Sequence, residues 1–205
     1  MKSSWPINDS RVNAAIIVAH PDDETIWMGG TILMNKNWKW TIFSLCRKDD
    51  PDRMPKFKKV CEYYGAESII SGLDDEELKS ISPLEIAEKI KNILNGLSYD
   101  YIFTHGNNGE YGHIRHKEIH QAVKNMIEKK ELKCKKVFYF SYVLGAKTVP
   151  DIPALHLAIP NTNSDIVASV DNNCFNEKIN LIIGYYGFAS NSFEALCCGR
   201  KEAFS

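Results

Sequence analysis

Residues 14–30 read AAIIVAHPDDETIWMGG, and the fold of the rest of the chain can be worked out from this stretch. The apolar run at residues 14–19 is short and rich in β-branched side chains, which is typical of a buried strand. It ends abruptly in the polar cluster HPDDE at residues 20–24. Pro21 fixes its own φ angle and pushes His20 into an extended conformation, so the chain leaves the strand stiffly. A polar cluster at the end of a buried strand is costly unless its groups are paired or bind a metal.

The residue types in this cluster indicate a metal site. Ligands bind at the carboxyl ends of strands in an open α/β sheet, and His20 and Asp23 can face one point there. One imidazole and one carboxylate are two of the three protein ligands that a catalytic zinc ion requires. Asp22 is turned to one side of that point, so its carboxylate is a candidate base for a water molecule on the metal.

Length and composition limit the class of protein. The chain has 205 residues, 44% hydrophobic and 25% charged, which suits one globular domain spanning residues 1–205. The net charge of −1 and the lack of a basic stripe argue against a nucleic-acid partner. No apolar run approaches the roughly 20 residues that span a bilayer, and the first ten residues lack the apolar segment of a secretory signal. Six cysteines without zinc-finger spacing then favour reduced thiols and a cytoplasmic location.

Short apolar segments alternate with helix-length segments along the chain. The predicted strands are 14–19, 40–46, 68–71, 99–104 and 137–143, and the predicted helices are 25–35, 56–64, 82–94, 117–129 and 176–188. This alternation favours a Rossmann-like α/β fold, with a mainly parallel sheet, right-handed crossovers and helices on both faces. We also predict an acidic turn at 74–78. Residues 149–163 hold three prolines and are predicted to be irregular apart from a strand at 155–159.

A second polar cluster follows the predicted strand at 99–104. It reads HGNNGEYGHIRH at residues 105–116. If this strand is a neighbour of the first one, the two polar loops meet at one edge of the sheet. His113 and His116 are three residues apart at the entry to a helix and so project from roughly one face. One of them can complete a His-Asp-His set with an open position, and the other can stabilise an oxyanion or protonate a leaving amine.

Together the two motifs resemble those of one enzyme family. AHPDDE at residues 19–24 is similar to the signature of the PIG-L/LmbE superfamily of metal-dependent N-deacetylases. GEYGHIRH at residues 109–116 is similar to its second motif, which usually ends in His-Pro-Asp-His. The resemblance covers roughly the first 125 residues. It implies a Rossmann-like fold and a hydrolase that uses Zn²⁺, or another divalent metal such as Fe²⁺. Such an enzyme removes an acetyl group from an N-acetylglucosamine-type sugar or a related small amide.

The resemblance also implies roles for individual residues. His20, Asp23 and His116 match the family's zinc ligands. Asp22 matches its general base, and His113 matches the histidine that assists the oxyanion or the leaving group.

Three further residues are candidates for substrate binding. Tyr111 resembles a tyrosine that lines the site in some members, and Arg53 resembles an arginine that meets the substrate. The second motif departs from the family at Ile114 and Arg115, where a cation stands in place of the usual aspartate. A nearby cation lowers the pKa of a histidine, so we expect Arg115 either to act in this way on His113 or to contact the substrate.

Two other functions stay open at this point. A Rossmann-like module that binds a nucleotide or sugar nucleotide without chemistry is disfavoured, because no Gly-x-Gly-x-x-Gly follows the first strand. A relative that keeps its metal but has lost turnover is conceivable because of Arg115. His120 could compete as a ligand, and His105 is expected to hydrogen-bond near the site or to cap its strand. The sequence leaves open the identity of the small-molecule substrate and whether the chain forms a homo-oligomer.

Overall fold

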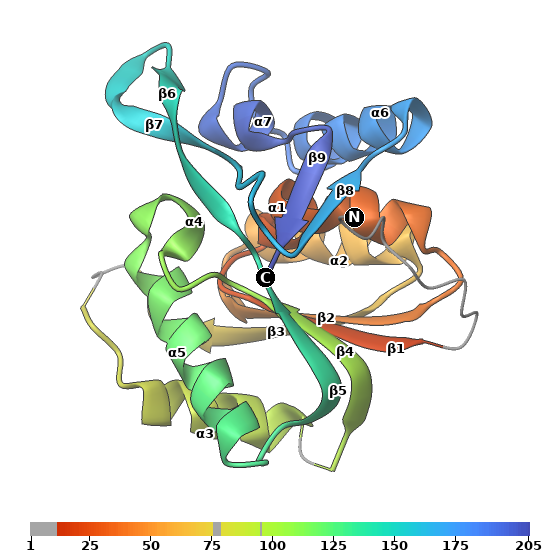
Figure 1. Cartoon of the computed structure of the whole chain (residues 1–205), viewed down its shortest axis with the longest axis vertical. Coiled ribbons are helices and arrows are strands. Elements are labelled where there is room, and N and C mark those ends of the chain that lie inside the picture. Colours follow the sequence, from red (N-terminus) through yellow and green to blue (C-terminus); the bar gives the residue numbers. More distant parts are fainter. Residues whose placement is uncertain (1–11, 76–78, 95) are drawn as a thin grey trace.

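A five-stranded parallel sheet forms the centre of the protein (Figure 1). The structure is a computed structural model that describes residues 12–75, 79–94 and 96–205. The strands, in the order in which they lie side by side, are β3 (Glu67–Leu73), β2 (Lys39–Cys46), β1 (Asn13–Val18), β4 (Ser98–Thr104) and β5 (Lys133–Tyr139). From β1 the chain first adds β2 and β3 on one side of the sheet and later adds β4 and β5 on the other side, so the order of the strands reverses between β1 and β4. The carboxyl ends of these two strands therefore flank the switch point at which ligands bind in such folds.

Helices cover both faces of this sheet. They are α1 (Asp23–Met34) and α2 (Arg53–Tyr64) on one face, and α3 (Pro83–Leu94) and α5 (Ile114–Glu128) on the other (Figure 1). Successive strand residues point to opposite faces, so Ile16 belongs to the core under α1 and α2, whereas Ile17 belongs to the core under α3 and α5. The predicted α/β fold with a mainly parallel sheet and helices on both faces is confirmed.

Helix α1 is enclosed on all sides. Every residue of α1 except Met34 is buried, because the C-terminal part of the chain packs on its outer surface (Figure 1). This part consists of β6 (Tyr142–Val149), β7 (Ile152–Pro160), β8 (Ile166–Ser169), α6 (Asn172–Asn180), the single π-helical turn η1 (Leu181–Tyr185), α7 (Phe193–Cys197) and β9 (Lys201–Phe204). Since α1 begins in the HPDDE cluster, the enclosure fixes the start of the helix and the polar groups on it.

The segment between residues 137 and 163 differs from the sequence prediction. The single strand predicted at 137–143 is two strands, β5 and β6, because the chain turns out of the central sheet after Tyr139. Residues 149–163, predicted to be mostly irregular, contain β7, which pairs antiparallel with β6. Pro153 and Pro160 are compatible with a strand here, because β7 belongs to a two-stranded sheet and one of its edges needs no backbone donors.

Smaller differences concern the ends of elements. Helix α6 begins four residues before the predicted start at 176, because the side chain of Asp171 caps it by accepting a hydrogen bond from the N–H of Cys174 (2.9 Å). Of the acidic turn predicted at 74–78, residues 76–78 lie outside the described residues. Across the described ranges, we find no helix that combines the length and apolar character needed to cross a membrane.

Candidate active site

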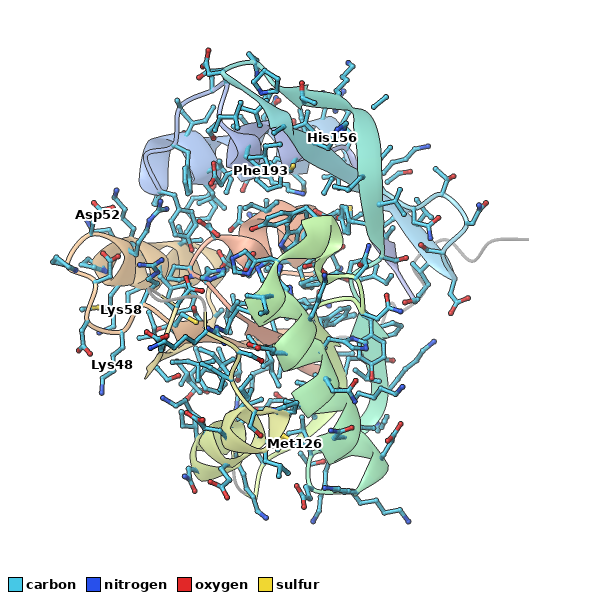
Figure 2. The ribbon with its side chains drawn as sticks, turned by 90° about the vertical axis from the view of Figure 1, so that its left-hand side faces the viewer. Lys48, Asp52, Lys58, Met126, His156 and Phe193 are labelled. Atoms are coloured by element: carbon cyan, nitrogen blue, oxygen red, sulfur yellow. The ribbon has the colours of Figure 1, made fainter. Side chains whose placement is uncertain are left out.

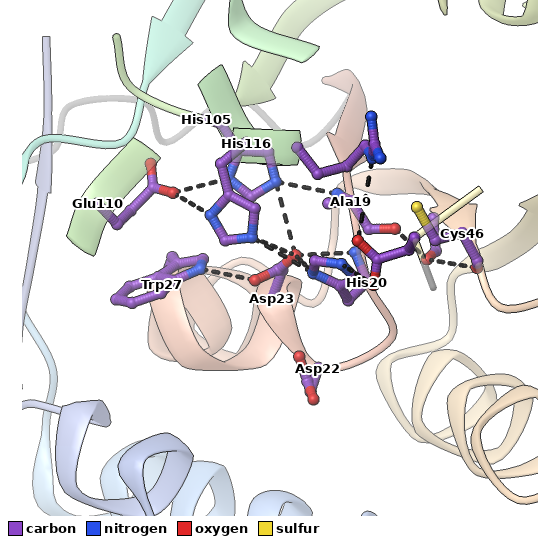
Figure 3. A network of polar contacts seen from close by, with 12 residues as sticks. Ala19, His20, Asp22, Asp23, Trp27, Cys46, His105, Glu110 and His116 are labelled. Carbon is purple, nitrogen blue, oxygen red and sulfur yellow. Dashed lines mark hydrogen bonds and ion pairs between the residues drawn. The ribbon is translucent and has the colours of Figure 1, made fainter. Parts of the chain in front are cut away.

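Three side-chain atoms converge near the carboxyl ends of β1 and β4. Nδ1 of His20 lies 3.3 Å from Oδ2 of Asp23 and 3.3 Å from Nε2 of His116 (Figure 3). Nε2 of His116 lies 3.4 Å from Oδ2 of Asp23. Ligands at about 2.1 Å from one tetrahedral ion are themselves about 3.4 Å apart. The spacing of His20, Asp23 and His116, which we call the ligand set, therefore fits a zinc-type centre with a fourth position left for water or substrate.

The turn between β1 and α1 fixes the carboxylate of the ligand set. The N–H of His20 donates to Oδ2 of Asp23 (2.8 Å), and Nε1 of Trp27 donates to its Oδ1 (2.9 Å) from one turn further along α1. Asp23 also occupies the first turn of α1, where the helix dipole favours a negative charge. Burial raises the pKa of Asp23, but the neighbouring His116 and His105 outweigh this effect and hold the pKa well below its usual value.

A buried carboxylate, Glu110, lies behind the histidines. Its Oε2 lies 2.6 Å from Nδ1 of His116 and 2.9 Å from Nδ1 of His105 (Figure 3). Nε2 of His105 accepts a hydrogen bond from the N–H of Ala19 (2.9 Å). These contacts assign the ring proton of both histidines to Nδ1 and leave the lone pair on Nε2 of His116 for the site. Burial raises the pKa of Glu110, but His105 and His116 outweigh this effect and lower the pKa to about 2.

Asp75 stands at the other ring nitrogen of His20. Its Oδ2 lies 3.0 Å from Nε2 of His20 and accepts a hydrogen bond from Nη2 of Arg47 (2.9 Å). Burial lowers the pKa of His20, but its contacts with Asp23 and Asp75 outweigh this effect and raise the pKa to about 10. Asp75 follows β3 at the same edge of the sheet, so its carboxylate lies beside Nε2 of His20, while Nδ1 of His20 faces Asp23 and His116.

Two members of the ligand set, His20 and Asp23, border a cavity of about 310 Å³. Asp22, Arg53, Tyr111 and His113, all predicted from the sequence as site residues, line it. Asp22 has a left-handed backbone, with φ 113°, and its Oδ2 lies 3.4 Å from Nη1 of Arg53. The guanidinium of Arg53 also lies over the ring of Phe188, 4.2 Å from its centroid. Burial raises the pKa of Asp22, as does the nearby carboxylate of Asp23.

His113 reaches the cavity from the residue that precedes α5. Its ring centroid lies 4.9 Å from that of His20, and its Nδ1 is buried with no hydrogen-bond partner in the described part of the chain. Burial lowers the pKa of His113 to about 3, and the nearby His116 and His20 lower it too. A buried polar atom without a partner beside a cavity indicates a place where a ligand supplies the hydrogen bond.

Arg115 does not line the cavity. Its side chain is fully buried, with Nη1 paired to the carboxylate of Glu118 and Nη2 donating to the carbonyl oxygen of Lys79 (3.1 Å). Oε1 of Glu118 in turn accepts from the N–H of Ile81 (2.9 Å). We therefore correct the prediction that Arg115 binds substrate or tunes His113. Glu118 neutralises its charge, and the pair joins α5 to the segment that precedes α3.

Two further histidines lie away from the ligand set. Nδ1 of His120 contacts the carbonyl oxygen of His105 (2.9 Å), so this ring is hydrogen-bonded behind the site and is no competing ligand. His156 lies on β7 and contacts the carbonyl oxygen of Gly145 (2.9 Å; Figure 2). His105, by contrast, does hydrogen-bond beside the site, as expected.

The C-terminal part of the chain completes the wall of the cavity. Phe193, labelled in Figure 2, and Glu194 of α7 line it. The centroid of the Phe193 ring lies 4.6 Å from that of Tyr111. Neither residue was identified from the sequence, since no local pattern connects α7 with the two motifs.

The sequence also missed three polar partners of the ligand set. Trp27 stands four residues after Asp23 on a helix, and that spacing could have revealed the contact. Asp75 carries no such signal, because its contact with His20 depends on how loops from different strands meet. The partners of Glu110 lie in its own polar cluster, but the turn that aims its carboxylate at them follows no regular spacing.

The same regions match a known protein family. A family model described as PIG-L: GlcNAc-PI de-N-acetylase matches residues 15–127. The chain belongs to the PIG-L family. The matched region contains both polar motifs and the whole ligand set, so the resemblance seen in the sequence is confirmed.

One further protein is similar to this PIG-L chain over part of its length. An uncharacterized protein of Acanthamoeba polyphaga mimivirus is 25% identical over 124 residues, 53% of this chain and 55% of that protein. The chain therefore matches about half the length of this relative.

Three solved structures share the fold over most of both chains. A conserved protein of Thermus thermophilus has a TM-score of 0.68 and is 14% identical, with 94% of this chain and 93% of that chain covered. N,N'-diacetylchitobiose deacetylase of Pyrococcus horikoshii has a TM-score of 0.62 and is 15% identical, with 97% of this chain and 84% of that chain covered. The 4-carboxy-2-hydroxymuconate hydratase GalB of Pseudomonas putida has a TM-score of 0.57 and is 13% identical, with 83% of this chain and 77% of that chain covered. The likeness thus extends into the C-terminal part, beyond the family match. A hydratase among these neighbours shows that the fold alone does not fix the reaction.

Proposed function

We propose that this PIG-L protein is a metal-dependent N-deacetylase. It hydrolyses the acetyl amide of an N-acetylglucosamine-type sugar or a related small amide, with Zn²⁺ as the first choice of metal and Fe²⁺ as the alternative. The observation that carries the proposal is the 3.3–3.4 Å spacing of the ligand set beside a cavity that also holds Asp22 and His113. The description of the family and the deacetylase from Pyrococcus horikoshii among the structural neighbours support this reaction class.

Each side chain of the site has its own role in the proposed hydrolysis. His20, Asp23 and His116 would hold the metal, which when bound acidifies water and polarises a carbonyl group. Asp22 takes the proton of the attacking water, and the burial that raises its pKa brings it closer to the range in which a carboxylate accepts a proton at neutral pH. His113 faces the acyl group with its unpartnered Nδ1 and assists the amide oxygen or the leaving amine.

Two residues are assigned to substrate binding. The guanidinium of Arg53 is positioned between Asp22 and the ring of Phe188, and Tyr111 is packed against Phe193. A volume of about 310 Å³ is at the small end of the ~300–1,000 Å³ range of ligand sites, which suits a single sugar ring.

Acetate release is the direct test. Purified protein loaded with zinc is incubated with N-acetylglucosamine in free, glycosidic, lipid-linked and nucleotide-linked form, and acetate is quantified. We expect release from at least one form, loss of release on chelation and recovery when Zn²⁺ or Fe²⁺ is returned. Stoichiometric metal without acetate from any form would favour an inactive relative. A metal-free protein that binds a sugar nucleotide would favour a binding module.

A cytoplasmic location is also part of the proposal. All six cysteines are free thiols, which is the usual state in a reducing compartment. Fractionation of the source cells, followed by immunodetection of the untagged protein, tests this assignment.

A further inference from the structure

Glu110 has a backbone conformation that residues with a Cβ rarely adopt. Its φ is 58° and its ψ is −58°, directly after Gly109 with φ 65°. Backbone strain of this kind persists only when the surroundings enforce it, and it concentrates at functional sites. Glycine would adopt the same conformation at much lower cost. A glutamate in this position therefore needs a reason that lies in its side chain.

The carboxylate of Glu110 is buried and surrounded by donors. Oε1 accepts from the N–H of Gly106 (2.7 Å), while Oε2 faces Nδ1 of both His116 (2.6 Å) and His105 (2.9 Å). The two imidazole rings are stacked, with centroids 3.8 Å apart and an angle of 18° between the planes. A buried carboxylate is tolerated when hydrogen bonds satisfy it, and here they also fix the orientation of both rings.

The positions of the ring protons follow from these contacts. Nε2 of His105 accepts from the N–H of Ala19, so the proton of His105 is on Nδ1 and points at Glu110. Nδ1 of His116 faces the same oxygen and donates to it. Without Glu110, His116 is free to carry its proton on Nε2, the atom that belongs to the ligand set.

A second metal centre at His105, Glu110 and His116 is the alternative reading of this group. The distances of 2.6 and 2.9 Å argue against it, because they are hydrogen-bond lengths. Atoms that share one ion lie further apart, as those of the ligand set do.

We propose that Glu110 is a positioning residue for the metal centre. Its carboxylate keeps His116 in the Nδ1–H tautomer and stacked on His105, so that the lone pair of Nε2 faces His20 and Asp23 before a metal binds. The strained turn at Gly109–Glu110 aims the carboxylate. The inference rests on the proposed metal-dependent function. Removing a partner of this kind weakens metal binding by about 10–100-fold in known sites.

Two variants test the proposal. In Glu110→Gln the new NH₂ group must face either the N–H of Gly106 or the two histidine N–H groups, so at least one hydrogen bond is lost while the shape is kept. Glu110→Gly removes the side chain and relieves the backbone strain, so it is expected to fold even if Glu110→Gln does not. Competition with a chromophoric chelator should show zinc affinity falling about 10–100-fold in both variants.

Glu177→Gln is the matched control. This half-exposed carboxylate on α6 accepts from Tyr63 and contacts Lys36, away from the ligand set, so its loss should leave zinc affinity unchanged. Thermal unfolding of all variants gives their stability separately. A lower melting temperature in the Glu110 variants with an unchanged zinc affinity would mean a structural role only and would overturn the proposal.

The tautomer of His116 supplies a readout that does not need metal. Nitrogen-15 NMR of the zinc-free protein should show His116 protonated at Nδ1 in the wild type and shifted towards Nε2 in Glu110→Gly. The same tautomer in both proteins would overturn the proposal. If the wild type binds no divalent metal, the proposed function fails, and the tautomer comparison alone decides the role of Glu110.

Discussion

At the scale of single residues, the ligand set is oriented by partners that use the atoms facing away from the proposed metal position. Trp27 holds Oδ1 of Asp23 and leaves Oδ2 for the site. Glu110 holds Nδ1 of His116 and leaves Nε2. Partners of this kind orient the ligands and tune the metal, so the ligand atoms of the protein are arranged before an ion is present.

Loss of any member of the ligand set should abolish metal binding. We expect His20→Ala, Asp23→Ala and His116→Ala each to remove most of the bound zinc, because two remaining ligands leave no redundancy. Metal analysis of the purified variants measures this directly. His120→Ala is the control, since its ring contacts the carbonyl oxygen of His105 and should leave the zinc content intact. Full zinc in His116→Ala together with loss in His120→Ala would contradict the assignment.

Asp22→Asn should separate catalysis from metal binding. Asparagine keeps the size of the side chain and tolerates the left-handed backbone of this residue, but it cannot accept the proton. Turnover should fall by about 10²–10⁴-fold while zinc stays bound. Acetate release and zinc content are measured on the same preparation. Wild-type turnover of zinc-loaded Asp22→Asn would assign the base to another residue.

At the scale of elements, helix α5 carries one residue of the ligand set and also holds the segment before α3 in place. His116 points from its first turn into the ligand set, while Arg115 points to the segment before α3 and pairs with Glu118. This segment follows the loop that carries Asp75, so the buried pair connects the helix with the polypeptide on the far side of the site. The unusual arginine in the second motif is therefore a structural feature.

Arg115→Asp, which restores the usual residue of the family, should destabilise this protein. It places a carboxylate next to Glu118 and removes the hydrogen bond from Nη2 of Arg115 to the carbonyl oxygen of Lys79. Breaking a buried ion pair from one side costs about 3–5 kcal/mol, and urea denaturation measures the loss. Lys117→Asp makes the same kind of change at the exposed neighbouring position and should stay within about 0.5 kcal/mol of the wild type. Equal stabilities of the two variants would refute the structural role.

At the scale of the whole molecule, a buried ion pair joins the C-terminal part to helix α1. Oε1 of Glu202 on β9 accepts from Nζ of Lys178 on α6 (2.6 Å) and from the N–H of Gly30 (2.8 Å). Oε2 accepts from the N–H and the hydroxyl group of Thr31 (2.7 and 2.6 Å). Both charged side chains are fully buried. The pair thus ties β9, α6 and α1 together at one point.

Lys178→Met should lower the stability of the entire protein. It leaves the charge of Glu202 buried without its cation, which costs about 3–5 kcal/mol in comparable pairs. Lys36→Met breaks the exposed pair with Glu177 and should cost less than about 1 kcal/mol. The free energy of unfolding in urea, followed by circular dichroism, compares the two. A similar small loss in both variants would show that the buried pair contributes little.

The sequence by itself determined the parallel α/β sheet and the residues of the ligand set. Both are local information: strands and helices follow from the spacing of apolar residues, and polar clusters directly after strands lie at one edge of a parallel sheet. His20 and Asp23 could therefore be placed beside the second polar cluster in advance, whereas the choice of His116 over His113 came from the resemblance to the PIG-L family. The strand at residues 152–160 was predicted only over residues 155–159, because prolines obscure the ends of an edge strand that is stabilised by its neighbour.

Only the tertiary structure decided how buried charges pair. Glu110 contacts two histidines, Arg115 pairs with Glu118 and lies 3.9 Å from Asp75 at the edge of the cavity, and Lys178 reaches Glu202 across separate elements. A charged side chain in a sequence has many partners within reach, and burial selects the one whose geometry compensates the loss of water. For Lys178 and Glu202 that selection depends on the packing of separate elements, and for Glu110 and Arg115 it depends on which way a turn or a helix faces once the core is packed.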